Sequence, residues 1–161
     1  MSRTPQLRTD GVLVDTNVLL LLLVGSVDIR YIRQHKRTAK YDSDALTTAQ
    51  TFIARFRSVL TTPHVLAETA NILVGGMRDQ AVLQLWEAFR IVCRQFDERH
   101  SPAHVLSRDT ALHRLELTDI GIIRMARRGW VVLTDDLDLF IELQSRNLQA
   151  VNFTNLRFPD S

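Results

Sequence analysis

The chain has little cysteine and no long run of apolar residues. Cys93 is the single cysteine among 161 residues, so no disulfide can form within the chain and a reducing compartment is favoured. The apolar run from residue 18 to residue 24 is far shorter than the roughly 20 residues that span a bilayer. It follows an acid and is not followed by a cleavage-site pattern, which argues against a signal peptide. These absences predict a cytoplasmic protein without a membrane span.

Linkers, repeats and metal-type clusters of cysteine and histidine are also absent from the sequence. Without Gly/Ser-rich linkers or a shift in composition, 161 residues fit one domain, and we predict a single domain over residues 1–161. The lack of a Cys/His cluster argues against a zinc site.

Lysine is the scarce base. Lys36 and Lys40 are the only lysines among the 20 basic residues, which leaves 18 arginines, although the formal net charge is only +2. Arginine suits two-point contacts to phosphate, so this usage favours a polyanionic partner. Genome composition is the alternative explanation, and the sequence does not separate the two.

The stretch from Gly11 to Leu20 organises the rest of the chain. Its first four residues form a short apolar run before polar, turn-forming residues, which predicts a buried parallel strand with Asp15 at its carboxyl end. Thr16 or Asn17 is expected to cap a helix that begins at Val18. In an open α/β sheet ligands bind at this edge, so Asp15 is either a functional acid or a helix cap.

Further strands and helices alternate along the chain. Strands are expected at 59–61, 130–134 and 150–153, the last followed by a polar tail. Helices are expected after Ser26, from Asp42 to about Arg57, and over 63–74, 78–96, 118–128 and 139–143, with a helical stretch after Ser101. This alternation predicts an α/β fold, a three-layer α/β/α sandwich around a mainly parallel sheet of four or five strands.

Carboxylates recur at the expected carboxyl edge of this sheet. Glu68 and Asp119 fall near the starts of helices, and Asp136 follows the strand 130–134. Grouping these acids with Asp15 would raise their pKa values unless a cation is bound, and oxygen ligands select hard ions, so we predict a Mg²⁺ or Mn²⁺ site. Asp135 and Asp138 are either additional acids of the site or helix caps.

The motifs Asp15-Thr16-Asn17, Glu68 within residues 65–68, Asp119 within residues 117–119 and Thr134-Asp135-Asp136 together resemble the PIN-domain ribonucleases. In length and motif order the chain is similar to the VapC-like toxins of bacterial type II toxin–antitoxin pairs. The resemblance covers Val12 to about Phe153.

The resemblance implies a metal-dependent ribonuclease that hydrolyses phosphodiester bonds of single-stranded or structured RNA. Asp15, Glu68, Asp119 and Asp136 would be both the catalytic residues and the ligands of Mg²⁺ or Mn²⁺, and one or two ions would activate water. Thr16, Asn17 and Thr134 would orient these ligands. Rim arginines such as Arg30, Arg124 or Arg127 would hold the RNA backbone.

The resemblance also implies protein partners. A cognate antitoxin is one of them, but the stretch Ser26–Thr51 is longer than in compact toxins and leaves open whether the same antitoxin groove exists. A homodimer is the other, because the apolar stripes of the helices after Asp44 and Arg78 exceed what one small sheet covers.

Two other functions remain open. An aspartyl-phosphate phosphohydrolase would use Asp15 as its nucleophile. Enzymes of that kind have a second acid two residues later, where this chain has Asn17. A non-catalytic RNA-binding or partner-binding scaffold would use the acids only as helix caps.

Overall fold

A computed structural model describes residues 10–159, so the predicted domain limits at 1 and 161 lie outside the described residues. Within them, five strands form one sheet in the order β3-β2-β1-β4-β5, and every neighbouring pair is parallel. The strands are β1 (Gly11–Val14), β2 (Ser58–Thr61), β3 (Asp97–Glu98), β4 (Val131–Thr134) and β5 (Ala150–Asn152). The predicted parallel sheet is therefore confirmed, and β3 adds a strand that the pattern did not predict.

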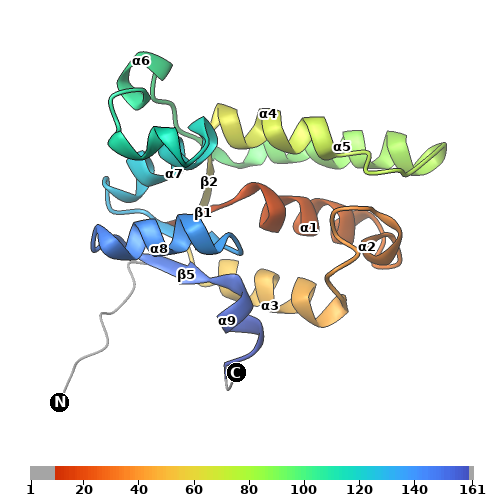
Figure 1. The fold of residues 1–161 in the computed structure, drawn as a ribbon. Coiled ribbons are helices and arrows are strands. Elements are labelled where there is room, and N and C mark those ends of the chain that lie inside the picture. Colours follow the sequence, from red (N-terminus) through yellow and green to blue (C-terminus); the bar gives the residue numbers. More distant parts are fainter. Residues whose placement is uncertain (1–9, 160–161) are drawn as a thin grey trace.

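Helices cover both faces of this sheet (Figure 1). All four residues of β1 and all four of β4 are buried. Because successive side chains of a strand point to opposite faces, this burial requires a covering layer on each side. The three-layer α/β/α architecture expected from the sequence is confirmed.

Three helices connect β1 to β2: α1 (Thr16–Val27), α2 (Tyr31–Gln34) and α3 (Ser43–Ile53). The expected start of a helix after Ser26 is wrong, because α1 continues through Gly25 and Ser26. A side chain on Gly25 would approach Leu46 Cδ2 of α3 to 2.7 Å, so this glycine allows close packing of the two helices. The predicted helix start at Asp42 is confirmed, since Asp42 is the N-cap of α3 and its Oδ1 accepts a hydrogen bond from Ala45 N–H at 2.8 Å.

Two helices, α4 (Pro63–Ile72) and α5 (Gln80–Gln95), connect β2 to β3. Pro63 occupies the first turn of α4 as predicted, and Thr62 Oγ1 caps it by accepting from Val65 N–H at 3.2 Å. Gly75 and Gly76 follow α4 with positive φ angles of 48° and 87°, which fits the predicted end of that helix. Helix α1 packs against α3, α4 and α5.

The remaining helical elements are α6 (Ala103–Leu106), the 3₁₀ turn η1 (Thr110–His113), α7 (Leu117–Ala126), α8 (Leu137–Ser145) and α9 (Phe153–Arg157). The expected polar tail after Phe153 is wrong, because these residues form α9. Asn152 caps that helix by accepting from Asn155 N–H at 3.1 Å, and Phe153 is fully buried. None of the helices within residues 10–159 has the length and apolar character needed to cross a membrane.

Candidate functional site

Asp15 lies where the order of the strands reverses. The chain passes from β1 to β2 and β3 on one side of the sheet, and then to β4 and β5 on the other. The carboxyl ends of β1 and β4 therefore flank the crevice in which open α/β sheets bind ligands. Asp15 N–H donates to Leu133 O of β4 at 3.0 Å, which fixes the residue at this crevice.

The carboxylate of Asp15 is buried and held from three directions. Its Oδ1 accepts from Val18 N–H at 2.9 Å, and its Oδ2 accepts from Asp135 N–H at 3.0 Å and from Thr134 Oγ1. Asp15 is thus itself the N-cap of α1, and the expectation that Thr16 or Asn17 caps a helix starting at Val18 is wrong. The side chain of Asp15 therefore both caps α1 and lies in the crevice.

Burial, together with the negative charge of Asp135, raises the pKa of Asp15 above its ordinary value. The hydrogen bond from Thr134 opposes this shift. Desolvation disfavours the charged carboxylate, and a nearby like charge adds to the cost. Of this pair of carboxyl groups, Asp15 is the one that retains a proton to higher pH.

Asp135 is held in its charged form by residues from the stretch 26–51. Lys40 Nζ lies 2.7 Å from Asp135 Oδ2, which also accepts from Tyr41 Oη, and Asn17 Nδ2 donates to Oδ1 at 3.1 Å. Burial disfavours ionisation, but the hydrogen bonds from Lys40 and Tyr41 and the charge of Lys40 outweigh it and lower the pKa of Asp135. Asp135 therefore supports the crevice through Lys40, Tyr41 and Asn17.

Lys40 and Tyr41 were missed by the sequence-based reasoning. No spacing rule links Tyr41 to an acid 94 positions away, and the available signal was only that Lys40 is one of two lysines in the chain. Tyr41 is buried against Phe153, with ring centroids 5.9 Å apart. The stretch 26–51 thus contributes to the neighbourhood of the acids.

Asp119 belongs to a capping box at the start of α7. Its carboxylate accepts from Glu116 N–H at 3.2 Å, and Glu116 is the N-cap residue of the helix that was expected over 118–128. Burial raises the pKa of Asp119 to about 6, and the negative charges of Asp136, Glu116 and Glu68 contribute. Two of the three acids with which Asp119 was predicted to group, Glu68 and Asp136, therefore lie close enough to raise its pKa.

Asp136 caps α8 at the exposed edge of the site. Its Oδ1 accepts from Leu139 N–H at 3.0 Å, and its own N–H donates to Thr134 Oγ1 at 3.0 Å. Thr134 therefore links Asp136 to Asp15, as expected of a residue that orients the acids. Asp138 lies exposed in the first turn of α8, where its negative charge interacts favourably with the helix dipole.

All four predicted acids line one small cavity of about 40 Å³. Its lining also includes two of the three residues expected to orient them, and consists of Asp15, Thr16, Asn17, Glu68, Thr118, Asp119, Ile122 and Asp136. Neither Asp138 nor Asp135 is among these residues. The structure therefore brings the four predicted acids together and leaves Asp138 outside.

The lining fits a hard cation in its chemistry and size. Four carboxylates supply oxygen ligands, and a cavity of about 40 Å³ exceeds the roughly 10–15 Å³ that one water requires. Within residues 10–159, however, no three Asp, Glu, His or Cys side chains already converge as a metal site. Ion binding would therefore require the exposed Asp136 and the half-buried Glu68 to turn toward Asp15 and Asp119.

Comparison with known proteins supports the fold alone. No protein-family model and no curated protein sequence matches the chain. Among solved structures, the chain is similar to the crystal structure of PAE2754 from Pyrobaculum aerophilum, with a TM-score of 0.55 and 18% sequence identity. That similarity covers 93% of this chain and 96% of the other. The α/β/α fold found here is thus also the fold of a known protein.

Proposed function

We propose that the chain is a Mg²⁺- or Mn²⁺-dependent ribonuclease that hydrolyses phosphodiester bonds of single-stranded or structured RNA. The observation that carries this proposal is the cavity lined by Asp15, Glu68, Asp119 and Asp136, which come from four separate parts of the chain. The order and context of the motifs, which resemble those of PIN-domain ribonucleases, add to it.

Each acid of the cavity would have a separate role in the reaction. A bound divalent ion supplies charge stabilisation at the phosphate and lowers the pKa of an attacking water. Asp15 is held in one orientation by Thr134 and by two backbone N–H groups. Asp119 is held at the start of α7 by the Glu116 N–H and would be a second carboxylate ligand of the ion. Asp136, at the exposed edge, is the acid best placed to face an incoming strand.

A non-catalytic scaffold is the second candidate. It is favoured by the observation that Asp15, Asp119 and Asp136 each accept a backbone hydrogen bond at the start of a helix. Capping alone, however, does not explain why the three caps and Glu68 share one cavity. The site offers no such support for an aspartyl-phosphate phosphohydrolase. The position of its second acid is occupied by Asn17, whose Nδ2 donates a hydrogen bond to Asp135.

Cleavage of an end-labelled single-stranded RNA by purified protein tests the proposal. We expect cleavage with Mg²⁺ or Mn²⁺ and none with chelator, and we expect Asp15→Asn to lower the rate at least about 100-fold. Asp138→Asn is the matched control, because it removes an acid outside the cavity, and it should cleave like wild type. Equal cleavage by wild type and a folded Asp15→Asn variant would favour the scaffold.

Self-association is part of the same proposal. An apolar groove of about 720 Å³ lies between α1, α3 and α5, and Leu22, Ile53 and Ile91 are among its lining residues. Ile91 and Leu83 of α5 are 43% and 64% exposed, so this face leaves apolar surface in water. We expect a dimer by sedimentation at micromolar concentration and a monomer for Ile91→Asp. A wild-type monomer would contradict this part.

A toxin role adds a cognate antitoxin as partner. Growth arrest on expression in a bacterial host, relieved by the product of a neighbouring reading frame, would assign that role. Expression without any effect on growth would instead favour a solitary ribonuclease.

A further inference from the structure

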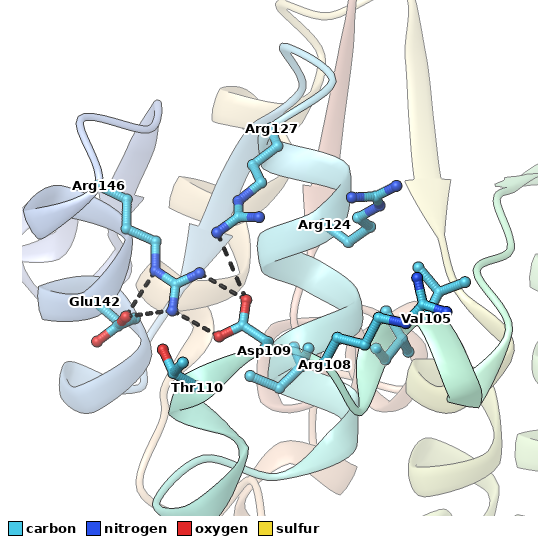
Figure 2. Close-up of a pocket in the computed structure, with 10 residues that line it drawn as sticks. Val105, Arg108, Asp109, Thr110, Arg124, Arg127, Glu142 and Arg146 are labelled. Carbon is cyan, nitrogen blue, oxygen red and sulfur yellow. Dashed lines mark hydrogen bonds and ion pairs between the residues drawn. The ribbon is translucent and has the colours of Figure 1, made fainter.

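A second hollow of about 570 Å³ lies beside α7, away from the acids, and it is lined by arginines (Figure 2). Its charged lining residues are Arg108, Asp109, Arg124, Arg127, Glu142 and Arg146. Four positive and two negative charges leave an excess of +2. Its size is that of a site for a small molecule or for part of a larger one.

The wall formed by η1 and α8 is fixed by ion pairs. Arg146 donates to both oxygens of Asp109 at 2.7 and 2.8 Å and lies 2.6 Å from Glu142 Oε1. Arg127 lies 3.6 Å from Asp109, and Arg114 reaches Glu142 from outside the hollow. Arg146 and the two acids are at most 17% exposed, so they form a rigid wall whose charges are paired with one another.

Arg108 and Arg124 take no part in these ion pairs. Neither guanidinium makes an ion pair or hydrogen bond to another of residues 10–159, and Figure 2 shows both outside the dashed network. Arg124 is half-buried and Arg108 is exposed. Two unpaired guanidinium groups beside a pre-formed wall provide donors in the fork geometry that suits phosphate.

The arginine hollow lies along the same two helices as the acid cavity. Helix α7 carries Asp119 at its start and Arg124 five residues later, which is about 7.5 Å along the helix axis. Helix α8 begins after Asp136 and ends near Arg146, about 15 Å away by the same rise. The two helices pack against each other. On α7, Thr118, Asp119 and Ile122 line the acid cavity, whereas Ile120, Arg124 and Arg127 line the arginine hollow. At 3.6 residues per turn these two sets lie on opposite faces of α7, so an RNA strand that reaches both hollows has to pass around this helix.

We propose that Arg108, Arg124 and Arg127 bind a phosphate group in this hollow, and that its source is the backbone of an RNA strand whose other part reaches the acid cavity. The source of the phosphate rests on the proposed function, whereas the phosphate site itself does not. A helix-dipole role explains cations near the end of α7 but not Arg108, which lies between α6 and η1.

The test measures RNA binding in chelator, where no cleavage interferes. The double variant Arg108→Gln/Arg124→Gln is compared with Arg57→Gln/Arg94→Gln, which removes the same charge from two exposed positions outside the hollow. For a labelled single-stranded RNA we expect at least a tenfold weaker Kd in the first variant only. The slope of log K against log salt should fall by about 1.4, since each phosphate contact of a single strand contributes about 0.7.

A second arm separates the two sources of phosphate. Inorganic phosphate or a nucleoside monophosphate that raises the Tm of wild type but not of the double variant, with RNA binding unchanged, would keep the phosphate site and assign it to a small molecule. Equal RNA affinity in wild type and both variants, with no shift of Tm by phosphate, would overturn the inference. Equal weakening in both double variants would do the same, because it would reflect net charge alone.

Arg108→Gln alone repeats the test at an exposed position, in case substitution of the half-buried Arg124 disturbs folding. RNA binding that depends on the arginines without any metal-dependent cleavage would leave the phosphate site standing and remove the ribonuclease proposal. The two claims therefore fail separately.

Discussion

Replacing Asp119 by asparagine is expected to stabilise the metal-free protein at pH 7 by about 1–2 kcal/mol, while RNA cleavage falls at least about 100-fold. The pKa of Asp119 is raised to about 6 by burial and by the charges of Asp136, Glu116 and Glu68, so ionising it at neutral pH costs free energy. That shift corresponds to about 3 kcal/mol at most, and solvent screening of a half-buried group reduces it.

Asparagine retains the oxygen that accepts the Glu116 N–H, so the capping box loses little. The measurement is chemical unfolding in chelator, with Asp138→Asn as control. That variant removes an exposed first-turn acid of α8 and should lose about 0.3–1 kcal/mol through the helix dipole, without loss of cleavage. An Asp119→Asn protein that is less stable than wild type and still cleaves would reduce Asp119 to a helix cap.

The stability of the metal-free wild type is expected to fall as the pH rises from about 4 to about 7. Asp15 and Asp119 both have raised pKa values in the folded protein, so the native state holds protons that the unfolded chain has released above its pKa of 3.8. Their contribution is complete below pH 3.8 and is lost as the pH passes their folded pKa values.

Other acids act in a lower pH range. Asp109, Asp135 and Glu142 have lowered pKa values through their arginine, lysine and tyrosine partners. Their contribution is present above the ordinary pKa values of 3.8 and 4.5 and is lost as the pH falls through the lowered values. These three acids therefore do not reverse the expected decline between pH 4.5 and 6.5. Burial lowers the pKa of His35, which opposes the decline just below pH 6.5, because there the unfolded chain holds a proton that the native state has released.

A divalent ion should oppose that decline, because it binds the gathered acids of the native state and not the unfolded chain. At a concentration 100 times its Kd, an ion adds about 2.7 kcal/mol to the stability of the native state. Thermal melting in chelator and with Mn²⁺ at pH 4.5, 5.5, 6.5 and 7.5 measures both effects. A flat pH profile together with a Tm that Mn²⁺ leaves unchanged would contradict the prediction.

The sequence predicted those parts of the fold that depend on short-range patterns. The apolar runs before Asp15 and Asp135 are strands β1 and β4, and Pro63 and Asp42 mark helix starts, because strand burial and capping act within a few residues. The parallel sheet then brings Asp15 and Asp136, which follow β1 and β4, to one edge, while Asp119 lies in the first turn of α7 and Glu68 in the middle of α4. These short-range positions allowed the four acids to be grouped from sequence.

Features that depend on long-range packing were not predictable in this way. Gly25 resembles a helix break, but its role is the close approach of α1 to Leu46. Tyr41 meets Asp135 only because the segment before α3 folds back over the crevice. The pairing of Arg146 with Asp109 likewise requires η1 and α8 to be side by side.

The most direct test is the anomalous diffraction of Mn²⁺ in crystals grown near pH 7. We expect a peak in the cavity between Asp15, Glu68, Asp119 and Asp136, with the Asp136 and Glu68 side chains turned toward it, and no peak in crystals of Asp119→Asn. Well-diffracting crystals soaked in millimolar Mn²⁺ that show no peak in this cavity would contradict this expectation.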